Sequence, residues 1–502
     1  MQHNAGPQNP GHDRQWVRLL LAGLAALLVI RVGALAANGT DLFFDEAQYW
    51  FWSTQPAFGY YSKPPLIAWL IGISTATCGD SEFCIRLPSP ILHTLTSLVV
   101  YALARRLYDV QTGVLAGLAF ATLPGVSVSA GIMSTDVPLL LFWALSLLGL
   151  VWLMEQKDEP GDWRPSLLLG TSLGLGLNAK YAMAWFLACL VVYLLATPQR
   201  RWLLRDRRLY AALGLALLVI SPNLVWNMGN DLATFSHTAD NAKWGGSLFH
   251  PGKALEFFGA QFGVFGPILF GSLLIIAVRA AREPLPEADR LLLAFCLPLI
   301  AAITLQAFLS RAHANWAAPA YVAASALVMA TMVRDVASRW MRASFAVHAL
   351  VLIAAVVGVA LAGRYALPLA RDPFARTLGW QALAQATRDE LQKARAAGRP
   401  FAAVLTDDRP VTAELLYYLR DETTPIYAWR DGPHARDHFE LVRPFVPAGN
   451  APVLLVSLIG SDGPIVSRFV DAETIATRDI PAGPLESRRA VFVALSGLKN
   501  PG

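Results

Sequence analysis

The chain has 502 residues, of which 55% are hydrophobic and 15% are charged, and its formal net charge is +5. Soluble domains average roughly 25% charged residues, so this composition excludes an ordinary soluble protein and requires lipid as part of the solvent. The positive charge comes mostly from arginine clusters between apolar segments, where the positive-inside rule expects them. We therefore predict a polytopic α-helical membrane protein that contacts membrane lipids and has no nucleic-acid partner.

The first apolar segment, residues 19–30, follows a basic leader and precedes the sequence Ala34-Leu35-Ala36. This pattern imitates a cleaved secretory signal peptide. Arg31 interrupts the apolar segment before the apparent cleavage site, and the polar leader is long for a signal peptide. Both features favour a cytoplasmic leader over residues 1–16, followed by an uncleaved first span.

The loop after this span reads NGTDLFFDEAQYWFWSTQPAFGYYSKPPLIAWL. It joins the adjacent carboxylates Asp45 and Glu46 to many aromatic residues, including Tyr60 and Tyr61, and Lys63 precedes its two prolines. Aromatic rings anchor at the headgroup level and also stack against sugar rings. The alternative is that the two carboxylates only favour the first turn of an interfacial helix. We favour a functional role, because ionisable residues near membrane depth are costly and usually functional.

Residues 64–77 are apolar but too few for a span, which needs about 20 residues, so they predict an interfacial or re-entrant helix. Cys78 and Cys84 follow in the same loop. The sequence allows either a disulfide between them or two free thiols. Cys189 and Cys296 lie in apolar segments, and no cysteine has metal-ligand spacing. We expect no cofactor. The sequence does not decide whether a divalent metal is required, although no motif indicates one.

About eleven segments are apolar and long enough to be drawn as spans. Arginine-rich joints follow most of the even-numbered segments, so the N terminus is predicted to be cytoplasmic and the C terminus to lie outside. In a Gram-negative bacterium this protein would be in the inner membrane with a periplasmic tail. The segments are 17–37, 87–104, 112–131, 137–154, 165–180, 181–197, 209–227, 255–279, 291–309, 316–333 and 344–363.

Apolar spans stop near residue 365, so we divide the chain into a transmembrane domain at 17–365 and a tail at 366–502. The tail alternates helical and strand-like patterns, which predicts a small periplasmic α/β domain. Its elements are a helix at 380–396, a strand at FAAVL, a helix at 410–420, and strands near TPIYAW, APVLLVSL and RRAVFVAL.

Further charged residues are predicted on the same outer side as Asp45. Asp136 opens the fourth segment, although Pro138 two residues later also fits a simple helix start. For each cation alone, snorkelling of the side chain to the interface is the alternative. Together, carboxylates and cations suit a site that holds a phosphate diester and deprotonates an attacking hydroxyl. The cations are Lys63, Lys180, His237, Lys243, Arg311 and His313.

Six motifs stand out along the chain, namely FFDEAQYWFW, YYSKPPLIAWL, RLPS, ARRLYD, STDVPL and ANWAAPAY. They resemble those of the polyprenyl-phosphate-sugar-dependent glycosyltransferases of the GT-C architecture, which include lipid A aminoarabinose transferases and protein O-mannosyltransferases. The resemblance covers roughly residues 15–335, and the membrane domain followed by an α/β domain extends it to the C terminus. It implies a GT-C type polytopic bundle with a small C-terminal periplasmic α/β domain.

The resemblance also implies an activity, the inverting transfer of a sugar from a polyprenyl phosphate to an acceptor hydroxyl on the outer face. The acceptor would be lipid A or its core, a surface glycan or a protein. Asp45 is then the carboxylate that acts on the acceptor, Asp136 a second acid, and Lys63 the cation that holds the donor phosphate. His237 matches a histidine of a longer outer loop. Ser62 stands where some relatives carry an acid, and the aminoarabinose enzymes are expected to have thirteen spans.

Two other classes of protein remain open from the sequence. A lipid-linked sugar flippase or transporter would also have many spans and intramembrane cations. A non-enzymatic assembly protein would use its outer domain to bind a partner. The candidate residues gather on one face, and neither a Walker A motif nor G-x-G-x-x-G after a strand is present, so we favour the glycosyltransferase over both.

Overall fold

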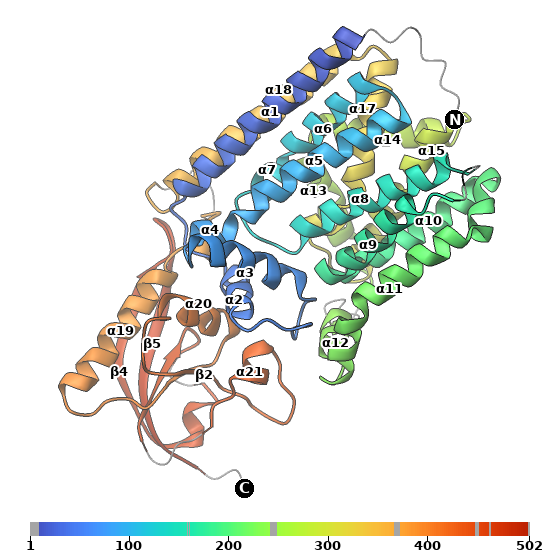
Figure 1. Cartoon of the computed structure of the whole chain (residues 1–502). Coiled ribbons are helices and arrows are strands. Elements are labelled where there is room, and N and C mark those ends of the chain that lie inside the picture. Colours follow the sequence, from blue (N-terminus) through green and yellow to red (C-terminus); the bar gives the residue numbers. More distant parts are fainter. Residues whose placement is uncertain are drawn as a thin grey trace. The chain divides into compact units, whose positions relative to one another are not determined.

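The computed structural model describes residues 10–157, 159, 161–240, 248–365, 372–446, 451–460 and 463–499. The chain forms two compact units (Figure 1). Unit 1 comprises Met1–Leu35, Lys63–Ile67 and Arg86–Val356, and unit 2 comprises Ala36–Ser62, Ala68–Ile85 and Val357–Gly502. The loop after the first helix therefore belongs to the same unit as the C-terminal tail, although the sequence suggested one boundary at residue 366.

Unit 1 is helical. Its elements are α1 (Pro10–Ala36), α5 (Pro88–Leu107), α6 (Val110–Thr122), α7 (Pro124–Ser129), α8 (Asp136–Glu155), α9 (Arg164–Ala179), η1 (Tyr181–Ala184), α10 (Trp185–Ala196), η2 (Pro198–Arg205), α11 (Arg207–Met228), α12 (Ala233–Asp240), α13 (Pro251–Val264), α14 (Pro267–Ala280), α15 (Glu287–Ala294), α16 (Leu297–Leu309), η3 (Ala314–Ala317), α17 (Ala320–Arg334) and α18 (Ser338–Leu361). The last residue of α1 and the end of α18 from Val357 onward belong to unit 2.

Six helical stretches in the described residues are long and apolar enough to cross a membrane, and a bent pair raises the number to as many as seven. Shorter apolar helices cover other expected segments, including Val110–Thr122, Tyr181–Ala196 and Ala320–Arg334. The protein is a multi-pass membrane protein. The expected number of about eleven spans stays a prediction, because these shorter helices do not reach the length of a full crossing.

The segment predicted as one span at 255–279 consists of two helices instead. Helices α13 and α14 are bent by 116° relative to each other. Between them Gly266 has a φ of 91°, and a Cβ atom there would lie 2.5 Å from Nε2 of His348. Glycine alone fits this conformation and this close approach, and Pro267 then starts the next helix. The helix pair covers the segment expected as one span, with a break that an apolar run does not reveal.

The segment predicted at 112–131 is also divided, into α6 and α7. Helix α6 ends at Thr122, where its last carbonyl groups have no partner within the helix. The buried guanidinium of Arg31 in α1 donates a hydrogen bond to the carbonyl of Ala121. The arginine that interrupts the first apolar segment thus caps the end of another helix.

Polar contacts in unit 1 gather the arginine-rich joints at one end of the helices. Arg106 pairs with Glu155, and Asp289 accepts hydrogen bonds from Tyr108 and Arg334, each at 2.7 Å. In the same way Arg200 pairs with Glu287, and Arg279 with Asp335 at 2.6 Å. These residues begin or end helices that are far apart in sequence, so the joints that the charge pattern placed on one side do lie together.

Unit 2 contains a five-stranded sheet in the order β2-β1-β3-β5-β4. Its strands are β1 (Val404–Thr406), β2 (Ile426–Ala428), β3 (Val453–Ser457), β4 (Phe469–Pro481) and β5 (Ser487–Leu498), and its helices include α19 (Trp380–Ala396), α20 (Arg409–Tyr418) and α21 (His438–Val442). Strand β1 is parallel to β2 and β3, whereas β5 is antiparallel to β3 and β4. Leu383, Leu415, Leu454 and Phe492 form part of the core between the sheet and the helices.

The α/β prediction for the tail is confirmed, and the helix expected at 380–396 has those bounds. Strand β4 was missed. Only Phe469 and Ile480 are buried among its residues, so the strand lacks the apolar face by which a sequence pattern reveals a strand.

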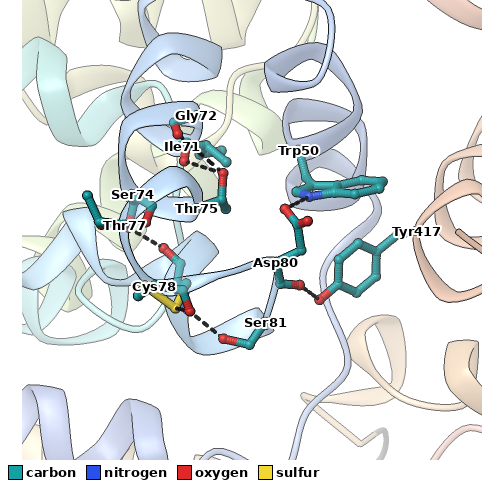
Figure 2. Close-up of a disulfide and its surroundings, with 11 residues drawn as sticks. Trp50, Ile71, Gly72, Ser74, Thr75, Thr77, Cys78, Asp80, Ser81 and Tyr417 are labelled. Atoms are coloured by element: carbon teal, nitrogen blue, oxygen red, sulfur yellow. Dashed lines mark hydrogen bonds between the residues drawn. A yellow bond between two sulfur atoms is a disulfide. The ribbon is translucent and has the colours of Figure 1, made fainter. Parts of the chain in front are cut away.

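The first loop folds within unit 2 around α2 (Phe44–Ser53), and the segment predicted at 64–77 is the helix α3 (Leu66–Cys78). After α3 the chain turns, and Cys78 and Cys84 form a disulfide. Within this turn Asp80 accepts a hydrogen bond from Nε1 of Trp50 at 2.7 Å, and its carbonyl accepts one from the hydroxyl of Tyr417 at 2.8 Å (Figure 2). The turn therefore connects α2 to α20.

Glu414 in α20 is fully buried, and neither of its carboxylate oxygens has a hydrogen-bond partner among the described residues. Burial raises the pKa of this carboxyl group well above its ordinary range. Nearby carboxylates raise it further, and Arg488 acts in the opposite direction; the carboxylates are Asp41, Glu46 and Glu82. Glu414 therefore holds its proton to a higher pH in the folded domain than in the unfolded chain.

This raised pKa predicts that unit 2 loses stability as the pH rises. The folded state binds the proton more tightly than the unfolded state, so each pH unit above the ordinary pKa and below the raised one costs about 1.4 kcal/mol of unfolding free energy. We expect the melting temperature to fall as the pH rises above the ordinary carboxyl pKa of about 4.5, and Glu414→Gln to reduce this fall.

Glu422→Gln is the matched control. Burial raises the pKa of Glu422 and a hydrogen bond from Arg395 lowers it, with a net shift downward. Its contribution to stability is therefore constant above about pH 5. Thermal unfolding of the purified protein at several pH values measures the three slopes. Equal slopes for wild type and Glu414→Gln would show that Glu414 is ionised in the folded state.

Candidate active site

The two adjacent carboxylates of the first loop have different surroundings. Glu46 is fully buried, and its Oε2 accepts a hydrogen bond from the backbone N–H of Phe43 at 3.0 Å. This contact satisfies a free amide at the start of α2, as a glutamate at the third helical position commonly does. Both acids lie in the first turn of α2, as the alternative expectation has it, and Glu46 is the one that accepts a backbone N–H there.

Asp45 forms an ion pair with Arg409, the first residue of α20. Oδ1 of Asp45 is 2.8 Å from Nη1 of Arg409, which also donates to Oε1 of Gln48 at 3.0 Å. The side chain of Asp45 is 36% exposed. Arg409 was not among the predicted site residues, and no local pattern distinguishes it, because it lies 364 residues from Asp45 in a different predicted domain.

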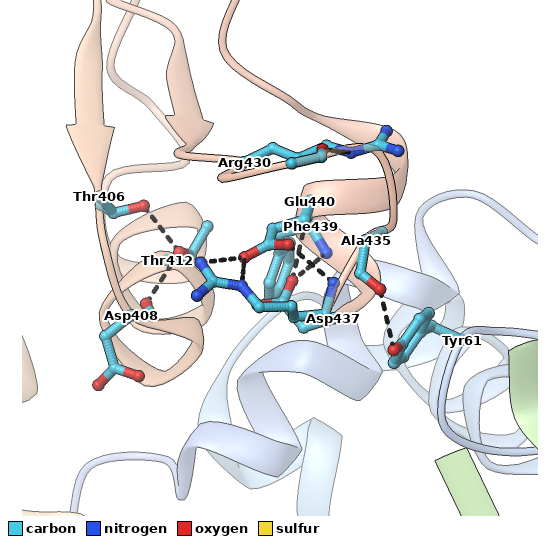
Figure 3. Close-up of polar contacts among 11 residues, drawn as sticks. Tyr61, Thr406, Asp408, Thr412, Arg430, Ala435, Asp437, Phe439 and Glu440 are labelled. Carbon is cyan, nitrogen blue, oxygen red and sulfur yellow. Dashed lines mark hydrogen bonds and ion pairs between the residues drawn. The ribbon is translucent and has the colours of Figure 1, made fainter. Parts of the chain in front are cut away.

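The two tyrosines that the sequence placed in the site, Tyr60 and Tyr61, also differ. The ring of Tyr60 is buried and stacks on Trp52 with 4.5 Å between the ring centroids, and its hydroxyl donates to the carbonyl of Trp52 at 2.9 Å. Burial raises the pKa of Tyr60 to about 12. Tyr61 is half-buried, and its hydroxyl donates to the carbonyl of Ala435 at 3.1 Å (Figure 3). Tyr60 thus packs inside the loop, and only Tyr61 keeps an accessible surface.

In unit 1, Asp136 is the centre of a second polar group. Its Oδ1 accepts from Nζ of Lys180 at 2.7 Å, and its Oδ2 accepts from Nδ2 of Asn315 at 2.6 Å. The side chains of Asp136 and Lys180 are only 11% and 20% exposed. Asp136 is the first residue of α8, but its carboxylate is bound to these two partners, so helix capping does not account for it. Asn315 was not among the predicted site residues.

The remaining candidates in unit 1 have varied environments. Arg311 lies between α16 and η3, is half-buried, and has no carboxylate partner among the described residues; its Nε is buried without a hydrogen bond. His313 is exposed beside Trp316, with 5.5 Å between the rings. His237 lies in α12 and Lys63 follows the first loop. Lys243 lies outside the described residues.

The predicted site residues therefore fall into two sets. Unit 2 holds Asp45, Glu46, Tyr60 and Tyr61, and unit 1 holds Lys63, Asp136, Lys180, His237, Arg311 and His313. Direct contacts connect Asp136 with Lys180 in one set and Asp45 with Arg409 in the other. Within the part of the chain that the structure describes, no three His, Cys, Asp or Glu side chains are arranged to hold a metal ion.

Known proteins share this fold. The chain is similar to ArnT of Cupriavidus metallidurans, with 16% identity over 97% of this chain and 99% of that one. The TM-score is 0.62 for the apo state and 0.59 for the complex with undecaprenyl phosphate. A family model described as dolichyl-phosphate-mannose-protein mannosyltransferase matches residues 62–226. The first comparison shows the fold of the chain, and the second shows the family model that part of it matches.

The sequences of relatives identify the family. Lipid A galacturonosyltransferase RgtD of Rhizobium johnstonii is 35% identical over 402 residues, which are 79% of this chain and 82% of that protein. Undecaprenyl phosphate-alpha-4-amino-4-deoxy-L-arabinose arabinosyl transferase of Pseudomonas aeruginosa is 33% identical over 167 residues, or 32% of this chain and 30% of that protein. The chain belongs to the GT-C glycosyltransferases, as its motifs indicated, and the alternatives of a flippase and an assembly protein are set aside.

Proposed function

We propose that this enzyme transfers galacturonate from a polyprenyl phosphate to a hydroxyl group of lipid A. The observation that carries the proposal is the similarity to lipid A galacturonosyltransferase RgtD, which extends over 82% of that protein. The similarity to the aminoarabinose enzyme covers only 30% of its length. A uronic acid is therefore a better candidate for the transferred sugar than an amino sugar.

The proposed reaction takes place on the periplasmic side of the inner membrane. Helix α18 begins beside the arginine-rich end of unit 1, where Arg279 contacts Asp335, and therefore ends at the opposite end. The positive-inside rule assigns the arginine-rich end to the cytoplasm. The disulfide between Cys78 and Cys84 in unit 2 is typical of an oxidising compartment such as the periplasm. Both observations support a cytoplasmic N terminus and a periplasmic C-terminal domain.

In the proposed mechanism the acceptor oxygen attacks the anomeric carbon of the donor sugar. A bond from that oxygen to the carbon forms, and the bond from the carbon to the phosphate oxygen breaks with inversion. Polyprenyl phosphate leaves with the electron pair, and Asp45 accepts the hydroxyl proton. Because the phosphate is already a good leaving group, cations that neutralise its charge replace a general acid.

The cations assigned to donor binding are Lys63, Lys180, Arg311 and the two histidines His237 and His313. Arg311 has the strongest support, because its guanidinium has no acidic partner among the described residues and its Nε is a buried donor without an acceptor. A guanidinium can bind a phosphate or a carboxylate through two parallel hydrogen bonds. Galacturonyl phosphate lipids carry both groups, so this residue suits the proposed donor.

Arg311→Gln is expected to raise the KM for the donor at least about tenfold with a smaller change in kcat, since a charge-assisted hydrogen bond to an anion contributes about 1.5–3 kcal/mol. The matched control is Arg282→Gln, which should behave like wild type. Arg282 is an exposed arginine that follows α14 at the arginine-rich end. Donor titrations with membranes that contain each variant measure both constants. An unchanged KM for Arg311→Gln would remove this residue from the donor site.

The function itself is tested with membranes that contain the enzyme, lipid A, and either polyprenyl phosphate-galacturonate or polyprenyl phosphate-aminoarabinose. Mass spectrometry of lipid A is expected to show one added hexuronic acid with the first donor. Addition of aminoarabinose alone would overturn the proposed sugar. Unmodified lipid A with both donors, under conditions in which a control transferase is active, would overturn the proposed acceptor.

A further inference from the structure

The first loop and the C-terminal domain are joined by contacts along the whole length of the loop. At its start, Oδ2 of Asp41 accepts from the backbone N–H of Trp380 at 2.7 Å, which caps the first turn of α19. Next, the N–H of Leu42 donates to the hydroxyl of Tyr418 at 2.9 Å. The loop therefore begins attached to two helices of the tail.

The middle and the end of the loop are attached in the same way. Trp50 packs edge-on against Tyr417 with 5.0 Å between the ring centroids. Phe51 packs against Phe439 of α21, with 5.4 Å between the ring centroids. Tyr61 donates to the carbonyl of Ala435, and Figure 3 shows this contact beside the loop that leads into α21. Helix α2 thus belongs to the C-terminal domain, and Asp45 moves with it.

One residue of the tail reaches the reactive carboxylate itself. The guanidinium of Arg409 contacts three side chains of the first two turns of α2, namely Oδ1 of Asp45, Oε1 of Gln48 and the ring of Phe44, whose centroid is 4.8 Å away. Oδ2 of Asp45 has no hydrogen bond among the described residues, and the side chain is partly exposed. Oδ1 of Asp45 is therefore bound by Arg409, whereas Oδ2 is left to accept a proton.

We propose that Arg409 is the positioning residue for Asp45. The C-terminal α/β domain then supplies a residue that orients the catalytic base, and it is more than an appended binding module. This inference rests on the proposed function, in which Asp45 accepts the proton of the acceptor. Arg409 fixes Oδ1 and orients Oδ2 toward the hydroxyl. Arginine suits this role, because its planar group bridges a carboxylate and an amide while its face rests on an aromatic ring.

A simple surface ion pair is the competing explanation. Arg409 and Asp45 are 32% and 36% exposed, and ion pairs at such exposure contribute little to stability. If the pair has only this role, removing the arginine changes little. If the arginine positions the base, a displacement of the carboxylate by about 1 Å costs about 10²-fold in rate.

The test compares Arg409→Gln, Arg409→Lys and Arg376→Gln. Arg376 is a close control, since it also comes from the C-terminal segment. Its guanidinium carbon lies 4.8 Å from the ring centroid of Phe43 and 5.4 Å from that of Phe44. The ion pair of Asp45 is with Arg409 and does not involve Arg376. We expect Arg409→Gln to lower kcat about 10–10²-fold with an unchanged donor KM. Arg409→Lys keeps the charge and should recover part of the rate, and Arg376→Gln should keep the wild-type kcat.

The same substitution in an Asp45→Asn background separates positioning from direct contact. If Arg409 acts through Asp45, Arg409→Gln causes no further loss in the residual rate of Asp45→Asn, because the two effects are not additive. Full additivity would show that Arg409 acts elsewhere, and wild-type kcat in Arg409→Gln would reduce the pair to a surface contact. Either result overturns the inference while leaving the proposed function in place. Full turnover of Asp45→Asn alone would instead overturn the role of Asp45.

Discussion

Replacing Asp45 with asparagine is expected to lower turnover about 10²–10⁴-fold, the usual contribution of a general base. Asparagine keeps the size of the side chain and an oxygen that accepts from Arg409, so α2 retains its contacts with α20. It removes the ability to accept a proton. The donor KM and the melting temperature should therefore stay near those of wild type, and initial rates of sugar transfer at saturating donor measure the loss.

Asp80→Asn is the matched control for this experiment. Asp80 also contacts α2, through the 2.7 Å hydrogen bond from Trp50, and asparagine retains an oxygen acceptor for it. Transfer by this variant should remain near the wild-type rate. Wild-type turnover of Asp45→Asn would exclude Asp45 as the base. Equal losses in both variants would instead assign the effect to the folding of the loop.

Much of the fold was predictable because it depends on patterns that are local in the sequence. Helix α19 has its expected bounds, and the arginine-rich joints lie together as the charge pattern indicated. The break at Gly266 was missed because it lies inside an apolar run, although Gly266 followed by Pro267 is a turn signal. Strand β4 was missed because most of its side chains are exposed.

The candidate site shows the same distinction between local and distant features. The acidic motif indicated Asp45 and Glu46, and the family resemblance favoured Asp45, but the sequence did not show that Glu46 is buried and Asp45 partly exposed. Their difference arises from Arg409 and Phe43, one far away and one adjacent. Asn315 and Arg409 could not be recognised, since an ion pair or amide contact between distant segments leaves no periodicity in either segment.

Lys180 and Asp136 allow a second test with a large expected effect. Removing one partner of a mostly buried ion pair leaves the other charge uncompensated, which typically costs about 3–5 kcal/mol in a buried setting. Asp136→Ala also leaves the amide of Asn315 without its acceptor. We expect both Asp136→Ala and Lys180→Met to lower the melting temperature clearly and to reduce transfer strongly, so neither single variant separates folding from donor binding.

The double variant Asp136→Asn with Lys180→Met makes that separation. It carries no charge at this position, and asparagine still accepts from Asn315, so the melting temperature should return toward that of wild type. If the ammonium of Lys180 stabilises the leaving phosphate, transfer stays lost in this stable protein, because methionine supplies no positive charge. Recovery of transfer together with stability would show that the pair only connects α8 to the segment after α9, and donor binding would then depend on Arg311 and Lys63.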